Sequence, residues 1–132
     1  MVVDRSAIFA IVLGEPERDS FAVAINSSPR RLVSAATAVE CVAVFAGRLA
    51  GRNPVTAMEL VFESLHLEVV PVDEAQWRAA ADALVRFGKG RHPARLNLGD
   101  SFAYALAKVT GEPLLFKGED FSRTDISSAA GP

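Results

Sequence analysis

Three acidic residues stand out because each lies in, or directly after, an apolar stretch. Asp4 follows the apolar residues at the start of the sequence, and Glu40 is the only charged residue of segment 32–47. Asp100 is the only charged residue of segment 96–107. A carboxylate in apolar surroundings costs free energy unless a cation or hydrogen-bond donors compensate its charge. Each of these acids therefore needs a partner.

A fourth candidate follows the apolar run 113–116, as either Glu119 or Asp120. In a parallel α/β sheet, ligands bind outside the carboxyl ends of the strands. Acids that follow different strands would therefore meet at one edge of the sheet. Because clustered carboxylates repel each other, a cation would hold them together. A ligand set made of carboxylate oxygens favours Mg²⁺ or Mn²⁺ over zinc.

Helix capping is the alternative explanation for two of these acids. Thr37 and Glu40 have the spacing of a capping box, as do Asn97 and Asp100. The helix dipole also favours an acid in a first helical turn. Capping does not explain why each acid lies in an apolar setting, so we favour a metal site, while capping remains open for either residue.

Apolar segments and turn residues alternate along the chain and define the elements that would position these acids. The pattern predicts a parallel sheet covered by helices on both faces, which is an α/β fold with three α/β/α layers. The Asp100 helix is apolar on nearly all sides, which predicts that it is buried. In the helix after Asp73, one apolar face is predicted by the helical spacing of Trp77, Ala80, Ala81, Leu84 and Val85. We expect strands at 1–4, 32–34, 68–72 and 114–116, and helices at about 17–25, 37–50, 54–65, 74–85 and 98–109.

The composition limits the possible classes of protein. A chain of 132 residues, half hydrophobic and 23% charged, is typical of one globular domain, here 1–132 with a short flexible tail from about 127. No apolar run reaches the roughly 18 residues of a membrane span, and a signal peptide's basic region is missing. A single cysteine, Cys41, suits a reducing cytoplasm. The net charge of -2 means that nucleic-acid binding would need a local basic patch.

Segment 86–95 supplies such a patch. It holds four of the 14 lysine and arginine residues and lies just before the Asp100 helix. Lys89, Arg91 and Arg95 would contact the phosphates of a nucleic acid and add affinity without reading the base sequence. A solvated surface loop is the alternative explanation.

The motifs around the acids resemble those of the PIN domain, and more narrowly those of the VapC toxins of VapBC toxin–antitoxin modules. The resemblance runs from the first residue to about residue 126. It implies the PIN fold and an endoribonuclease that depends on Mg²⁺ or Mn²⁺ and cuts structured RNA, tRNA or rRNA. The matching motifs are Met1–Asp4, Ser34–Thr37 with Glu40, Leu98–Phe102 and Leu115–Phe121.

Carried over by motif, the resemblance makes Asp4, Glu40 and Asp100 metal ligands and catalytic acids, with Asp120 as a fourth catalytic acid. A metal-activated water would then hydrolyse the phosphodiester bond. Glu40 or Asp120 would orient that water as general base. The resemblance also implies a type II toxin that forms a homodimer and binds a VapB-type antitoxin in a hetero-oligomer. The lack of a long apolar run predicts that the protein has no membrane partner.

One position departs from the family pattern. The family usually places a hydroxyl residue directly after the first Asp, whereas this chain has Arg5 there, followed by Ser6. Ser6 is a candidate for contact with substrate. Arg5 would either contact a substrate phosphate or pair with the acids and lower their metal affinity. The alternative function is a non-catalytic module, impaired by Arg5, whose acidic pocket receives a basic segment of a partner. A receiver-like domain ranks last, because no Asp on a central strand is placed as phosphoacceptor.

Overall fold

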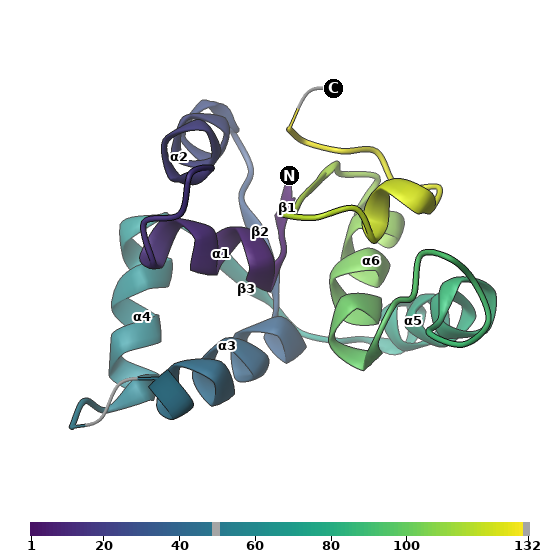
Figure 1. The fold of residues 1–132 in the computed structure, drawn as a ribbon, viewed down its shortest axis with the longest axis horizontal. Helices are drawn as coiled ribbons and strands as arrows, with labels where there is room; N and C mark the ends of the chain where they lie inside the picture. Colours follow the sequence, from purple (N-terminus) through teal and green to yellow (C-terminus); the bar gives the residue numbers. More distant parts are fainter. Residues whose placement is uncertain (49–50, 131–132) are drawn as a thin grey trace.

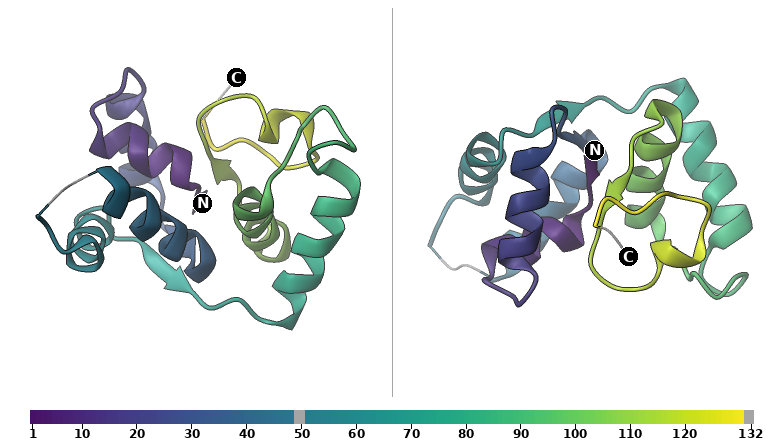
Figure 2. Two further views of the ribbon diagram at one scale, coloured as in Figure 1. Left: turned by 60° about the horizontal axis from the view of Figure 1, so that its bottom comes forward. Right: turned by 90° about the horizontal axis from the view of Figure 1, so that it is seen from above.

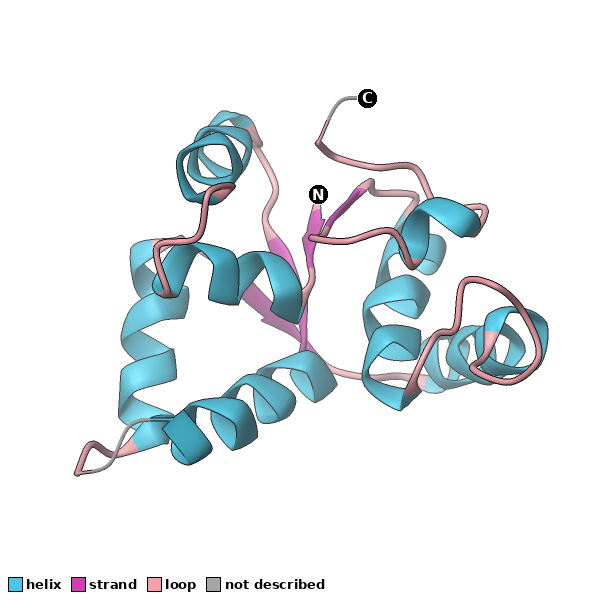
Figure 3. Ribbon diagram, viewed as in Figure 1, coloured by secondary structure: helices cyan, strands magenta, loops and turns pink. Residues whose placement is uncertain are grey.

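A four-stranded parallel sheet forms the centre of the computed structural model, which describes residues 1–48 and 51–130. Figure 3 shows the short strands between two groups of helices. The strand order is β3-β2-β1-β4, and every pairing is parallel. The predicted three-layer α/β/α fold is confirmed. The strands are β1 (Val2–Val3), β2 (Leu32–Ser34), β3 (Glu68–Val70) and β4 (Leu114–Leu115).

The helices cover the two faces of the sheet separately, as Figure 1 shows. The first face carries α1 (Arg5–Val12), α2 (Arg18–Ser27), α3 (Ala35–Arg48) and α4 (Pro54–Ser64). The second face carries α5 (Glu74–Phe87), α6 (Leu98–Thr110) and the 3-10 helix η1 (Phe121–Arg123). In both views of Figure 2, α5 and α6 lie side by side.

Adjacent residues of the strands enter different cores. Val2 and Leu114 pack beneath α5 and α6, whereas Val3 and Leu115 pack against the helices of the other face. Successive side chains of a strand point to opposite faces of a sheet. Two apolar residues in a row are therefore enough to join both cores, which explains why such short strands organise the domain.

Helix α6 carries Asp100 and has well-defined ends. The side chain of Asn97 accepts a hydrogen bond from the Asp100 backbone N–H, and the Asp100 carboxylate accepts one from the Asn97 N–H, both at 2.9 Å. Gly111 ends the helix in the left-handed region, at φ 69°. The helix is buried through Ala103–Ala107, so the predicted burial is confirmed, although Leu98 at its start is exposed.

Two expectations about helices are wrong. Helix α3 begins at Ala35, and the Ser34 hydroxyl oxygen accepts a hydrogen bond from the Ala36 N–H at this start. Thr37 therefore lies inside the helix and does not cap it. In α5, Trp77 and Val85 are 51% and 65% exposed. The buried residues of α5 are Gln76, Ala80, Ala83 and Phe87, and the two alanines let α6 pack closely against the helix.

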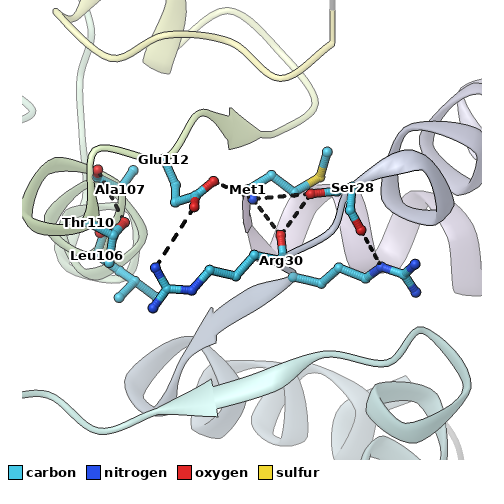
Figure 4. Close-up of polar contacts among 8 residues, drawn as sticks. Met1, Ser28, Arg30, Leu106, Ala107, Thr110 and Glu112 are labelled. Atoms are coloured by element: carbon cyan, nitrogen blue, oxygen red, sulfur yellow. Dashed lines mark hydrogen bonds and ion pairs between the residues drawn. The ribbon is translucent and has the colours of Figure 1, made fainter.

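The two ends of the described chain are joined to the sheet. The Met1 amino group donates hydrogen bonds to the Arg30 carbonyl at 2.6 Å and to the Glu112 carboxylate at 2.7 Å (Figure 4). Beyond η1, Leu114 N donates to the Ser127 carbonyl, and Ala129 N donates to the Leu114 carbonyl, each at 2.9 Å. Residues 127–129, which belong to the segment expected to be a flexible tail, thus pair with β4. Within the described ranges, every helix is too short or too polar to cross a membrane.

Candidate active site

The candidate acids gather at the edge of the sheet where the strands end, which we call the carboxyl edge. Asp4 directly follows β1, Glu40 lies in the second turn of α3 after β2, and Asp120 follows β4. In the sheet, β1 lies between β2 and β4. The chain leaves β1 toward β2 and later returns to β4 on its other side, which is the switch point where α/β folds bind ligands. The N-terminus of α6 brings Asp100 to the same edge.

Asp4 is buried, with 4% of its surface exposed, and two hydrogen bonds hold it. The Ser6 N–H and the Ser6 hydroxyl both donate to Asp4 Oδ2, at 2.9 and 2.5 Å. The same hydroxyl accepts from the Lys117 N–H at 3.0 Å, which ties α1 to the segment after β4. Burial raises the pKa of Asp4 above its ordinary value, although the hydrogen bonds from Ser6 oppose this rise. Ser6, expected to contact substrate, thus orients Asp4.

Glu40 reaches across to α6 because Gly99 has no side chain. A Cβ atom on Gly99 would overlap the Glu40 carboxylate, which therefore lies against the first turn of α6, one residue before Asp100. Glycine permits such a close approach. Sequence reasoning missed Gly99. The available signal was a glycine inside a first helical turn, where it lowers helix stability.

The four acids share one electrostatic environment, as Asp100 shows. Burial raises the pKa of Asp100 to about 6, and the hydrogen bond from Asn97 opposes this rise. The negative charges of Asp4, Asp120 and Glu40 are a smaller part of the same rise. Asp100 therefore has both expected roles: its carboxylate completes the capping box, and it lies close to the other acids.

Of the two candidates for the fourth acid, Asp120 rather than Glu119 is the one close to the other acids. Glu119 lies 3.3 Å from Arg123 and forms an ion pair within one helical turn. Asp120 is exposed and close enough to Asp100 to raise the pKa of that carboxyl. Its position after β4 places it on the opposite side of β1 from Glu40.

Arg5 pairs with one of the acids. Its Nε lies 3.2 Å from Glu40 Oε1. Burial raises the pKa of Glu40, Arg5 lowers it, and the charge of Asp4 raises it again, with a net rise. Of the two roles expected for Arg5, the structure thus contains the pairing with an acid.

The donor set fits a hard divalent cation in its chemistry, although it is not closed around one. Within residues 1–48 and 51–130, no three acidic, histidine or cysteine side chains are arranged to hold a metal ion. Asp4, Glu40 and Asp100 nevertheless present carboxylate oxygens, and burial raises the pKa of all three. A cation relieves the repulsion and the burial cost of such a set.

The basic loop is shorter than expected. Arg86 belongs to the last turn of α5 and pairs with Asp82 at 3.2 Å, and Phe87 is buried. Lys89, Arg91 and Arg95 are exposed on the connection between α5 and α6. These three side chains stand on the segment that leads into the Asp100 helix.

Fold and site together define a PIN domain. The family model for the PIN domain matches residues 1–127. Ribonuclease VapC42 of Mycobacterium tuberculosis is 45% identical over 131 residues, which cover 98% of both chains. Ribonuclease VapC of Mycolicibacterium smegmatis is 43% identical over 128 residues, which cover 97% of this chain and 98% of the relative. The chain therefore belongs to the VapC ribonucleases, the PIN-domain toxins of toxin–antitoxin systems.

Solved structures agree with the fold. Mycobacterium tuberculosis VapC20, a sarcin–ricin loop cleaving toxin, superposes with a TM-score of 0.76 at 19% identity over 98% of both chains. A toxin–antitoxin complex from Klebsiella pneumoniae gives a TM-score of 0.70 at 12% identity, covering 94% of this chain and 92% of that chain.

VapC ribonucleases with PIN domains generally depend on a divalent metal.

Proposed function

We propose that this protein is the toxin of a type II toxin–antitoxin module and acts in the cytoplasm as an endoribonuclease dependent on Mg²⁺ or Mn²⁺. Its substrate would be structured RNA, tRNA or rRNA. One observation carries the proposal: four acids from distant parts of the chain lie at one edge of the sheet. The charges of Asp4, Glu40 and Asp120 raise the pKa of Asp100 there, and the charge of Asp4 raises the pKa of Glu40. Membership of a family of named ribonucleases supports it.

In this proposal Asp4, Glu40 and Asp100 hold the divalent cation. When bound, the cation supplies positive charge that polarises the scissile phosphate and stabilises the leaving oxygen. Ser6 keeps the Asp4 carboxylate in one orientation through its two hydrogen bonds. Gly99 lets the Glu40 carboxylate approach the start of α6.

Asp120 serves as general base in this proposal. It is exposed at the carboxyl edge, on the side of β1 opposite Glu40, so the attacking water can reach it. A carboxylate within hydrogen-bond reach of that water orients it and accepts its proton. In-line attack then leaves a 5′ phosphate and a 3′ hydroxyl. Glu40 would share this role only when it is free of Arg5.

RNA affinity would come from the loop that carries Lys89, Arg91 and Arg95. Three exposed cations next to the Asp100 helix contact backbone phosphates without reading the base sequence. The proposed partners are the RNA substrate, a VapB-type antitoxin and a second copy of the chain. A carboxylate-lined edge attracts a basic antitoxin segment for the same electrostatic reason that it attracts a cation.

The ion pair between Arg5 and Glu40 favours a second candidate function. With Glu40 held by Arg5, the acidic edge would act as a non-catalytic module that receives a basic segment of a partner. The two functions predict different behaviour of the purified protein toward RNA. Only the ribonuclease needs a metal ion and an intact Asp100.

A cleavage assay separates the two. We expect the purified protein with Mn²⁺ to cut cellular RNA and to lose this activity with a chelator or in Asp100→Asn. Asp19→Asn is a matched control, because Asp19 also lies in a first helical turn but is exposed on α2. Mapping RNA 5′ ends in cells after induction would identify the target. Cleavage that persists with chelator would refute the metal mechanism, and peptide binding without any cleavage would favour the module.

A further inference from the structure

A cavity of about 320 Å³ lies beside the acidic edge, between α1 and α3. Its polar lining includes Ser6, which also holds Asp4, and three cations, Arg5, Arg48 and Lys117. One acid, Glu15, lines it as well. Arg48 and the N–H groups of Arg5 that do not contact Glu40 give the cavity donors for an anion, although it adjoins a cluster of carboxylates.

The three cations of the cavity differ in how many carboxylates they contact. The Lys117 ammonium lies 2.6 Å from Glu15 Oε2 and 3.2 Å from Glu17 Oε2, so two carboxylates balance its charge. Arg48 is exposed and pairs with no carboxylate in the described part of the chain. Arg5 makes one contact, through Nε, with Glu40. The cavity therefore has cationic groups that can bind a ligand without first losing strong ion pairs.

Arg5 belongs to both the cavity and the acidic edge. Its side chain and that of Glu40 are 34% and 29% exposed, and an ion pair open to solvent contributes little stability. A guanidinium has five N–H donors, and its planar fork matches the oxygens of a phosphate. A phosphate in the cavity would therefore compete with Glu40 for Arg5.

We propose that this cavity binds a backbone phosphate of the RNA chain and that Arg5 couples it to the acidic edge. With the cavity empty, the ion pair with Arg5 balances the charge of Glu40 and competes with a cation for its carboxylate. With a phosphate bound, Arg5 turns to the phosphate, and Glu40 joins Asp4 and Asp100 as a cation ligand. The inference rests on the proposed function and adds a phosphate subsite and an order to it, because substrate binding completes the metal site.

Such coupling is reciprocal. If a phosphate ligand raises the affinity for the metal, the metal raises the affinity for the phosphate ligand by the same factor. Coupling between two sites is usually worth about 5- to 150-fold in affinity. We expect a tenfold effect, since one ion pair is exchanged.

The test measures Mn²⁺ affinity of the purified protein by calorimetry, with and without a short oligothymidylate DNA. This probe presents a phosphodiester backbone, and a gel checks that it stays intact. Thymidine, which has no phosphate, is the control ligand, and Mn²⁺ binding to the DNA alone is subtracted. Inorganic phosphate in a separate arm shows whether a free anion suffices or a nucleic-acid chain is needed.

We expect the oligothymidylate, but not thymidine, to tighten Mn²⁺ binding by the wild-type protein about tenfold. Arg5→Gln should bind Mn²⁺ more tightly than wild type without the probe and should no longer respond to it. Arg48→Gln should bind the probe severalfold more weakly. Arg78→Gln, an exposed arginine on the opposite face of the sheet, should behave as wild type.

The possible failures are distinguishable. If the wild-type protein binds no Mn²⁺ with or without the oligothymidylate, the proposed metal site is wrong, and the proposed coupling through Arg5 is wrong as well. If it binds Mn²⁺ and cleaves RNA, but Arg5→Gln has the affinity and probe response of wild type, only the coupling is overturned. Thermal melting shows that each variant is folded, and Arg5→Lys, which keeps the charge, should retain part of the coupling.

Discussion

Replacing Asp100 by Asn should stabilise the metal-free protein at neutral pH. Burial raises the pKa of Asp100 to about 6 from an ordinary value of 3.8, with Asp4, Asp120 and Glu40 adding repulsion. The folded protein thus holds this proton more tightly than the unfolded chain does. The carboxylate therefore lowers the free energy of unfolding as the pH rises from about 4 to about 6, and its full cost is present above pH 6.

The magnitude follows from the pKa. A rise from 3.8 to about 6 corresponds to roughly 3 kcal/mol at 1.36 kcal/mol per pKa unit. Because Asp100 is only half-buried, solvent screening reduces the expected effect to about 1–2 kcal/mol. Asn keeps an oxygen that accepts the Asn97 N–H, so the capping box should survive the substitution. For a domain of this size, the change corresponds to roughly 3–8 °C in melting temperature.

The assay is thermal melting with chelator between pH 4.5 and 7.5. Wild type and Asp100→Asn should melt at similar temperatures at the acidic end, and the variant should melt higher at the neutral end. Added Mn²⁺ should then raise the melting temperature of wild type more than that of the variant. Asp19→Asn should show neither effect. A variant that is no more stable than wild type at pH 7.5, or a difference independent of pH, would refute the reasoning.

Three further substitutions test other contacts. Gly99→Ala should lower RNA cleavage and Mn²⁺ affinity at least tenfold, because its Cβ would overlap the Glu40 carboxylate, whereas Gly47→Ala, with open space around it, should not. Ser6→Ala should lower RNA cleavage about 10- to 100-fold, because Asp4 loses the hydrogen bond from the Ser6 hydroxyl that orients it. Unchanged cleavage kinetics would contradict this positioning role. Asp125→Ala removes the partner of a tyrosine and a lysine on α6 and should cost about 1 kcal/mol of unfolding free energy by denaturant titration, with RNA cleavage retained below the new melting temperature.

Local patterns in the sequence were enough to predict the layers of the fold. Apolar runs identified all four strands, and their alternation with helices predicted the parallel sheet. The spacing of Asn97 and Asp100 predicted a capping box that the structure contains. These features depend on neighbours within a few residues, whose preferences are local. Arg5, which follows Asp4 directly, was likewise visible as a departure from the family pattern.

Contacts between distant segments were decided only by the tertiary structure. Thr37 and Glu40 have the same spacing as a capping box, yet α3 begins earlier and the Glu40 carboxylate packs against Gly99. Residues 5, 48 and 117 line one cavity although no sequence pattern connects them. Which acid Arg5 contacts depends on how closely α1 approaches α3. That distance is set by the packing of whole helices on the sheet, and no short stretch of sequence encodes it.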